Sequence, residues 1–506
     1  MISSSSRGDR LTPQEAEIRF ALARAHRREE AIAVYGDLLR QVPGHVDSLN
    51  NMSVLLRLEG RLDGAEGHAR AAAEARPDDI ELWSNLGQIL ADQGRHDEAA
   101  TTFQRVIEEA PENAEGYRKM TTLFQKMGEF ERSRMVLARA WELGLDDPEL
   151  LQLQSLDGGS AFPEAARELA EELGQAGKCD PEAAATARFA LSVADERIGE
   201  HAAAFKHLAA ANRLVAKQVK YRAAEHDGYF DALEQVFDAD FFAGVAGGGS
   251  GSEQPVFVLG MPRSGTTLAE QIIASHSAAT AAGELGAMQD IEQDLPRLLG
   301  GEGYPRCLEG LGAEQAPQLT RDLAERYLAR LRRAGMPGGG EVARITDKMP
   351  PNFLRLGLIA ALLPKARVVH CRRSAMATCF SIYQQRFAAP LDFAYDLRSI
   401  AHYYGRYDRL MAHWRAVCPL PIHEVAYEDL IADPEGQARA LIAAAGLDWE
   451  DGCLRFHESA QAVNTASLWQ VRQPVYDSSL EKWRAYEDQL VPLRDALAAA
   501  GVDPDS

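Results

Sequence analysis

Cysteine is scarce in this chain, and its spacing forms no functional pattern. The six cysteines among 506 residues are scattered, without the Cys-x-x-Cys or Cys/His spacing of a zinc site. We therefore expect reduced thiols, a cytoplasmic protein and no metal site. Long apolar runs are also lacking, since none reaches the roughly 18 residues that a membrane-spanning helix needs. The first residues, Met1–Asp9, contain no apolar stretch, so no secretory signal is expected.

Positive charge is the second shortage. The chain has 54 Lys and Arg against 75 Asp and Glu, which gives a net charge of −21. Such an excess excludes broad binding to nucleic acid or to anionic membranes, although a local basic pocket remains compatible with it. Apolar residues make up 46% of the chain. A chain of this length and composition is expected to form roughly two to four domains with substantial cores.

The N-terminal part of the chain repeats every 34 residues. Small residues, large apolar residues, a turn glycine and a closing proline each return at this period. The series are Pro43, Pro77 and Pro111; Leu49, Trp83 and Tyr117; Met52, Leu86 and Met120; Ala31, Ala65, Ala99 and Ser133; and Gly60, Gly94 and Gly128.

The repeat from Trp83 through Leu86, Gly87, Ala99 and Phe103 to Pro111 closely resembles the tetratricopeptide consensus. The resemblance predicts an all-α solenoid over residues 10–243, with clear repeats to about 145 and degenerate repeats to about 220. Two interpretations of the solenoid remain open. Its concave surface binds a substrate or a protein partner, or the array supports self-association or the second domain.

The C-terminal half has a different pattern. Residues 244–254 are rich in Gly and Ser, which predicts a flexible linker, and a cut near Gly248 is expected to release a soluble second domain. Over residues 255–500, short apolar strands at 256–259, 366–371 and 420–425 alternate with helices. This alternation predicts an α/β domain with a parallel sheet, whose ligands bind beyond the carboxyl ends of the strands.

The segment Pro255–Leu268 reads as a strand, a tight loop and a helix that begins at about Gly265. Such a loop directs free backbone N–H groups and the positive end of a helix at a phosphate. The spacing Gly260-x-x-x-x-Gly265 is that of a P-loop, but Thr266 stands where a nucleoside-triphosphate site carries lysine. A nucleotide held by its 5′-phosphate, without Mg²⁺, is therefore favoured. The candidate ligands are Arg263, Ser264, Gly265, Thr266 and Thr267.

The form Pro-Arg-Ser-Gly-Thr-Thr at 262–267 resembles the 5′-phosphosulfate loop of sulfotransferases, and most closely that of the protein-tyrosine and carbohydrate branches. These enzymes use 3′-phosphoadenosine 5′-phosphosulfate as co-substrate and need no metal. Arg373 and Ser381, eight residues apart, match the family's pair of 3′-phosphate ligands. Tyr427, in the segment Tyr-Glu-Asp-Leu, is similar to a tyrosine near the nucleotide in the family.

The resemblance also implies catalytic residues. Glu284, in Gly-Glu-Leu-Gly, is similar to the general base of protein-tyrosine sulfotransferases. Lys348, in Thr-Asp-Lys-Met-Pro-Pro, is similar to the lysine that contacts the leaving oxygen, and Asp347 either orients it or caps the following helix. Ser467 falls where these enzymes carry a serine that contacts the phosphosulfate. Arg472 and Lys482 are further candidate nucleotide ligands.

Together the two resemblances make the chain similar to bacterial proteins that join tetratricopeptide repeats to a sulfotransferase domain. They imply transfer of a sulfuryl group to a hydroxyl or an amine of a peptide, protein, carbohydrate or other acceptor. Ala287 stands where protein-tyrosine sulfotransferases carry an arginine that grips acidic peptides, which disfavours such peptides here. Two alternatives are a catalytically inactive nucleotide-binding scaffold and an ATP-dependent P-loop kinase. Glu284 and Lys348 argue against the first, and Thr266 argues against the second.

Overall fold

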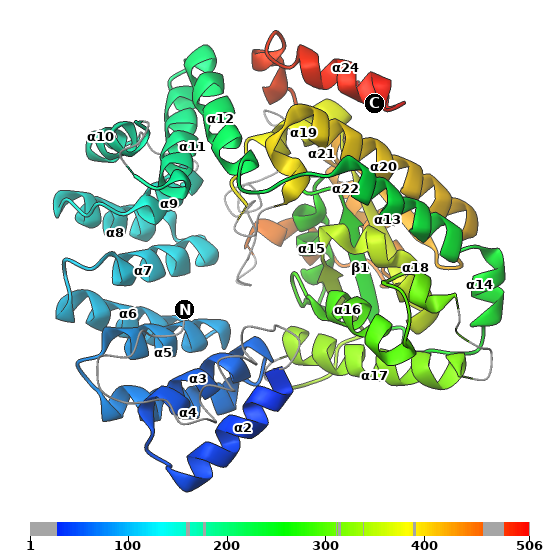
Figure 1. Ribbon diagram of the computed structural model, residues 1–506, viewed down its shortest axis with the longest axis horizontal. Helices are drawn as coiled ribbons and strands as arrows, with labels where there is room; N and C mark the ends of the chain where they lie inside the picture. The colour runs from blue at the N-terminus through cyan, green and yellow to red at the C-terminus, as the bar shows by residue number, and fades with distance from the viewer. Residues whose placement is uncertain are drawn as a thin grey trace. The chain divides into compact units, whose positions relative to one another are not determined.

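A computed structural model describes residues 28–157, 162–175, 179–309, 311, 315–336, 339–387, 391–458 and 480–504 (Figure 1). The contacts within the chain divide it into two compact units, Met1–Leu150 and Leu151–Ser506. The division falls well before the glycine-rich segment at which the sequence predicts a linker.

The first unit is a series of antiparallel helix pairs. Its helices are α2 (Arg28–Gln41), α3 (Val46–Leu58), α4 (Leu62–Ala75), α5 (Ile80–Asp92), α6 (His96–Glu109), α7 (Ala114–Met127) and α8 (Phe130–Glu142), and α9 (Pro148–Leu156) spans the division.

The repeated residues explain how these helices pack. Ala65 and Ala99 are fully buried, which lets neighbouring helices approach closely. Phe103 of α6 fills the space that the missing side chain of Gly87 leaves on α5, because a Cβ at Gly87 would lie 2.5 Å from the phenyl ring. Gly128 ends α7 in the left-handed conformation, at φ 80°. The predicted tetratricopeptide solenoid is confirmed for this unit.

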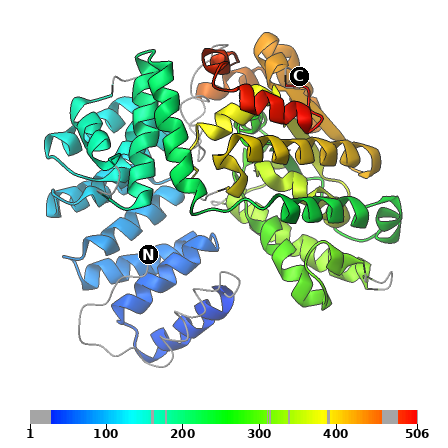
Figure 2. The ribbon, with the colours of Figure 1, turned by 45° about the horizontal axis from the view of Figure 1, so that its top comes forward.

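The second unit begins with more helices, which are α10 (Glu164–Leu173), α11 (Pro181–Arg197), α12 (His201–Ala216), α13 (Ala223–Val236) and α14 (Ala239–Gly244). Phe189, Leu208 and Phe230 of these helices, and Phe237 directly after α13, belong to the same hydrophobic core as the α/β domain that follows. Helix α13 lies along α20 (Leu397–Val417) in both views (Figures 1 and 2), and the side chain of Arg406 pairs there with Asp231.

The glycine-rich segment is packed rather than flexible. The N–H of Gly249 donates to the hydroxyl of Thr320 at 2.9 Å, and the N–H of Ser250 donates to the carbonyl of Leu362 at 2.8 Å. A Cβ at Gly249 would lie 2.4 Å from the Leu362 oxygen. The glycines therefore permit a close approach of two backbones, a use of glycine that composition alone does not distinguish from linker flexibility.

A five-stranded parallel sheet forms the centre of the second unit, which confirms the predicted α/β fold. The strand order is β2-β3-β1-β4-β5, with bounds β1 (Pro255–Gly260), β2 (Ala279–Ala281), β3 (Arg344–Lys348), β4 (Arg367–Arg372) and β5 (Ile422–Ala426). Strand β1 is buried throughout and lies at the middle of the sheet. The chain therefore leaves β1 between β3 and β4, where ligands bind in open α/β sheets.

Helices and short 3₁₀ turns surround the sheet. The helices are α15 (Thr266–Ala274), α16 (Ala287–Leu299), α17 (Ala316–Gly335), α18 (Leu356–Leu362), α19 (Ala375–Tyr383), α21 (Tyr427–Ala432), α22 (Pro434–Ala444) and α24 (Val491–Ala499). The 3₁₀ turns are η1 (Arg306–Leu308), η2 (Pro350–Arg355), η3 (Asp392–Tyr395), η4 (Asp451–Glu458) and η5 (Lys482–Tyr486). None of the helices in the described ranges combines the length and the apolar composition that a membrane crossing requires.

Candidate active site

The register of the sheet brings most of the predicted site residues to one edge. Lys348 ends β3 beside Val258 of β1, and Gly260 ends β1 beside Cys371 of β4. Arg372 ends β4 beside Ala426 of β5, next to Tyr427. Because all the strands are parallel, the loops that follow them meet at this carboxyl edge.

Two glycines shape the loop after β1. Gly260 has a φ of 149°, and a Cβ there would lie 2.3 Å from the carbonyl oxygen of Cys371. Gly265 has a φ of 98°, and a Cβ there would lie 2.8 Å from the ring of Tyr427. Arg263 between them also has a positive φ, of 71°. The loop is therefore held tightly against β4 and the start of α21, with its backbone in conformations that few residues adopt.

The loop leads into the first turn of α15. Gly265 is the N-cap of this helix, and no side chain caps it, so its first N–H groups remain directed out of the helix end. The Ser264 hydroxyl is buried, at 2% residue exposure, and has no hydrogen-bond partner among the residues that the structure describes. Thr266 and Thr267 are buried at the same end. An anion with several acceptor oxygens fits this set of donors.

Arg263, Ser381, Arg373 and Tyr427 form one connected group. The Arg263 Nε donates to the Ser381 hydroxyl at 3.0 Å, and an Arg373 Nη1 donates to the Arg263 carbonyl at 3.4 Å. The Arg373 guanidinium also lies 5.0 Å from the centre of the Tyr427 ring. Two turns of α19 separate Ser381 from the end of β4, so this helix carries the hydroxyl back toward the loop.

Glu284 and Lys348 form an ion pair at the same edge. The Lys348 Nζ donates to the Glu284 Oε1 at 2.6 Å, and the side chains are 1% and 43% exposed, respectively. The backbone N–H of Lys348 donates to the Gly283 carbonyl at 2.9 Å. A partly exposed carboxylate thus lies against a buried ammonium group, so a proton acceptor and a cation are available within one small region.

Two buried carboxyl groups lie beside this pair, and the sequence prediction missed one of them. Burial raises the pKa of both Glu270 and Asp347, and the charge of Lys348 opposes that rise. The Asp347 Oδ2 accepts a hydrogen bond from Tyr327 at 2.8 Å. The only signal of Glu270 in the sequence is that it is the one charged residue of α15.

Lys482, which the sequence predicts as a nucleotide ligand, forms an ion pair in the second unit. Its Nζ lies 2.6 Å from the Glu196 carboxylate of α11, which also accepts hydrogen bonds from Tyr486 at 2.7 Å and Gln384 at 2.9 Å. Ser467 and Arg472 lie outside the described residues.

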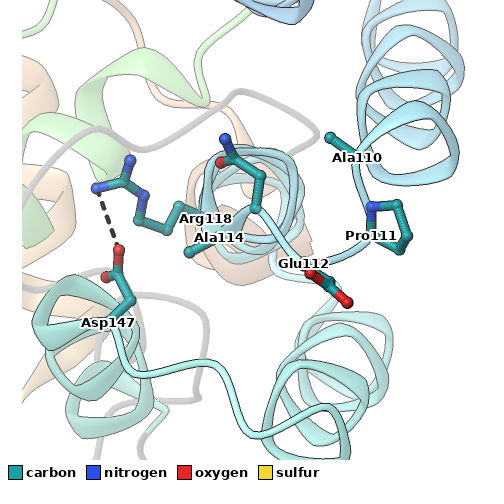
Figure 3. Close-up of a pocket in the computed structure, with 7 residues that line it drawn as sticks. Ala110, Pro111, Glu112, Ala114, Arg118 and Asp147 are labelled. Carbon is teal, nitrogen blue, oxygen red and sulfur yellow. Dashed lines mark ion pairs between the residues drawn. The ribbon is translucent and has the colours of Figure 1, made fainter.

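A hollow in the first unit is a second candidate site (Figure 3), with a volume of about 610 Å³. It is lined by Ala110, Pro111, Glu112, Asn113, Ala114, Arg118 and Asp147. Its cation, Arg118, already lies near three carboxylates, at 3.7 Å from Asp147 and closer to Glu115 and Glu149. The charge is therefore locally neutralised, and the hollow has no feature that selects an anion.

A parallel sheet whose central strand enters a helix through a glycine loop, with arginines around that loop, is an arrangement typical of α/β domains that bind phosphate groups. Residues 255–451 match the sulfotransferase family, and residues 21–80 and 68–114 match the tetratricopeptide repeat. Residues 255–451 therefore form a domain of the sulfotransferase family, and the first unit carries tetratricopeptide repeats.

The chain is also similar to individual proteins, one of which is named as a sulfotransferase. An uncharacterized protein of Aquifex aeolicus is 32% identical over 428 residues, which are 84% of this chain and 55% of the relative. Protein-tyrosine sulfotransferase 1 of Danio rerio is 23% identical over 269 residues, which are 49% of this chain and 72% of the relative. The chain thus spans only about half the length of the Aquifex protein.

Among solved structures, the sulfotransferase domain of the Synechococcus PCC 7002 olefin synthase is 20% identical, with a TM-score of 0.34. The match covers 46% of this chain and 89% of that domain.

Proposed function

We propose that the protein transfers a sulfuryl group from 3′-phosphoadenosine 5′-phosphosulfate to a hydroxyl or an amine of an acceptor. The observation that carries this proposal is the Glu284–Lys348 ion pair at the sheet edge that also holds the phosphate loop. An inactive scaffold would have no need of a proton acceptor and a buried cation beside that loop. A kinase would need the lysine that Thr266 replaces.

The residues of the edge fit the donor nucleotide. The loop from Arg263 to Thr267, with the buried Ser264 hydroxyl, would hold the 5′-phosphate, and Arg373 with Ser381 would hold the 3′-phosphate. When bound, the nucleotide supplies an activated sulfuryl group on a phosphate that departs as an anion. In this proposal, these side chains and backbone N–H groups supply the positive charge and the hydrogen-bond donors for the co-substrate.

Glu284 and Lys348 have separate tasks in this proposal. The Glu284 carboxylate takes the proton from the acceptor hydroxyl or amine, since its exposed part is accessible to an acceptor. Lys348 places positive charge where negative charge develops on the departing phosphate oxygen. Its burial strengthens that effect, because charges interact more strongly where water is excluded.

The acceptor is proposed to be a peptide, a protein or a carbohydrate. The repeat unit is proposed to bind this acceptor, to bind a protein partner or to mediate self-association. The side chain of Ala287, at the start of α16, is 1% exposed and offers no charge to an acidic peptide.

The cysteines are all unpaired among the described residues, which supports our placement of the protein in the reducing cytoplasm.

Calorimetry with 3′-phosphoadenosine 5′-phosphate tests the nucleotide site. We expect binding that requires the 3′-phosphate and that weakens about 10- to 100-fold in Arg373→Ala, as for the loss of a charge-assisted hydrogen bond. Arg263→Ala should weaken binding of the same nucleotide and also of ADP, because it alters the 5′-phosphate loop.

Arg372→Ala is the matched control, since this neighbouring arginine is paired with Glu424 at 2.9 Å. Its affinity should equal that of the wild type. Preference of the wild type for ATP·Mg²⁺ would overturn the sulfotransferase proposal in favour of a kinase, and no nucleotide binding at all would remove the enzyme assignment.

A further inference from the structure

Helix α19 connects the two proposed ligands of the 3′-phosphate. It begins just after Arg373, and Ser381 lies in its last turn, where the hydroxyl accepts a hydrogen bond from the Arg263 Nε at 3.0 Å. The start of the helix is capped locally, because the Ser374 hydroxyl accepts the backbone N–H of Ala377. The last carbonyl groups of a helix have no partner within it, so the position of Ser381 depends on what holds the last turn.

A buried amide from a distant helix contacts the end of α19. The Asn212 Nδ2 of α12 donates to the carbonyl of Tyr383 at 2.9 Å, two residues after Ser381. The same nitrogen donates to the carbonyl of Leu208, in its own helix, at 3.0 Å. Asn212 is 1% exposed. Because a buried polar group costs stability when its partner moves away, this contact holds the last turn of α19 at a fixed distance from α12.

A carboxylate from a second helix contacts the next residue. The Glu196 Oε1 of α11 accepts a hydrogen bond from the Gln384 Nε2 at 2.9 Å and another from the Tyr486 hydroxyl at 2.7 Å. The Tyr486 ring packs on Phe380, the residue before Ser381, with 4.8 Å between ring centres. Glu196 therefore holds the last turn of α19 both directly and through Tyr486.

We propose that Asn212 and Glu196 are positioning residues that hold the last turn of α19 and thereby set the affinity for the 3′-phosphate of the nucleotide. This inference rests on the proposed function. Both residues act through Ser381, and neither contacts the nucleotide. A hydroxyl that is held in place before binding gives more affinity, because ordering it at the moment of binding costs free energy. Two helices that precede the α/β domain thus contribute to its nucleotide site.

The test compares Glu196→Leu with Glu196→Gln and adds Asn212→Leu, all in the full-length protein. Glu196→Leu removes the acceptor of Gln384 and Tyr486, whereas Glu196→Gln keeps a side-chain oxygen in its place. Asn212→Leu keeps the branched shape of the side chain and removes the donor. Affinities for 3′-phosphoadenosine 5′-phosphate and for adenosine 5′-phosphate are measured by calorimetry, and their ratio gives the contribution of the 3′-phosphate.

We expect each leucine variant to lose ~5- to 10-fold in affinity for 3′-phosphoadenosine 5′-phosphate, which is the contribution of one hydrogen bond. Affinity for adenosine 5′-phosphate should stay at the wild-type value, and Glu196→Gln should bind both nucleotides as the wild type does. An unchanged ratio in both leucine variants, or an equal loss for the two nucleotides, would overturn the positioning role.

Ser381→Ala shows whether Glu196 acts through the Ser381 hydroxyl. Adding Glu196→Leu to Ser381→Ala should cost no further affinity for 3′-phosphoadenosine 5′-phosphate, because the group that Glu196 positions is already absent. Losses that add in the double variant would show that Glu196 acts by another route, which contradicts the inference.

Hydrogen exchange gives a second measurement, made without nucleotide. The backbone amides of residues 380–384 should exchange faster in both leucine variants and at the wild-type rate in Glu196→Gln. Unchanged exchange in both leucine variants would refute the anchoring of α19. If the wild type itself has no preference for the 3′-phosphate, the proposed function fails and this inference fails with it. A wild-type preference that both leucine variants retain overturns this inference alone.

Asp195→Leu is the matched control. Asp195 is the neighbouring carboxylate of α11, with 3% exposure, and it accepts from Arg167 of α10 at 2.7 Å. Its replacement should lower the thermal unfolding temperature but leave the ratio of the two affinities and the exchange of the last turn of α19 unchanged. A change of ratio in this control equal to that in Glu196→Leu would reduce the effect to general destabilisation and would also overturn the inference.

Discussion

Glu284→Gln is expected to slow sulfuryl transfer by ~10²-fold or more, which is the contribution of a general base. Glutamine keeps the shape of the side chain and can still accept a hydrogen bond from the Lys348 ammonium group, so the local geometry should persist. Only the ability to take a proton is lost. The rate is best measured in a single turnover with bound 3′-phosphoadenosine 5′-phosphosulfate, so that product release does not mask the effect.

Nucleotide affinity should be unchanged in Glu284→Gln, because Glu284 is not among the proposed phosphate ligands. Asp290→Asn serves as the matched control, since this nearby carboxylate of α16 is paired with Arg330. It should transfer at nearly the wild-type rate. Full activity of Glu284→Gln would show that Glu284 is not the general base. A rate loss of the same size in Asp290→Asn would show that the rate depends on the net negative charge of this region rather than on a base at Glu284.

A fragment that begins at Asp147 is expected to fold and to bind nucleotide, whereas one that begins near Gly248 is expected to be insoluble. The shorter fragment lacks Phe189, Phe230 and Phe237, which lie in one core with the α/β domain. Each such residue contributes about 1.5–3 kcal/mol by its burial. The loss of all three, together with exposure of their partners, is comparable to the roughly 5–15 kcal/mol by which a domain is stable.

Polar contacts across the same surface would also be lost. Asn212 donates to the Tyr383 carbonyl at 2.9 Å, and His413 contacts the Phe237 carbonyl at 2.9 Å. The longer fragment keeps these contacts and keeps Asp147, which caps the first turn of α9. Soluble expression, thermal unfolding and nucleotide calorimetry compare the two. A soluble fragment from Gly248 that binds nucleotide would show instead that the α/β domain is independent, as composition predicts.

The sequence predicted the features that depend on neighbouring residues. The 34-residue period predicted the solenoid because each pair of helices packs through the same few positions, such as Ala99 and Phe103. The loop after β1 was predicted because its glycines occupy backbone conformations that a local motif specifies. Arg373 and Ser381 were predicted as a pair from their eight-residue spacing and the family resemblance, and in the structure both contact Arg263.

The missed features depend on residues far apart in the chain. Glu196 of α11 meets Gln384 and Lys482 because α11 packs against the second half of the chain, and no local pattern indicates that contact.

The sequence by itself determined the repeat, the strand–loop–helix element and the residue types at the carboxyl edge of the sheet, because local periodicity and local backbone conformation encode them. Only the tertiary structure decided that helices α11–α14 share the core of the α/β domain. It alone buried the carboxyl groups of Glu270 and Asp347 within reach of the charge of Lys348. Burial and pairing between distant segments arise from the packing of the whole unit, and no single segment carries that information.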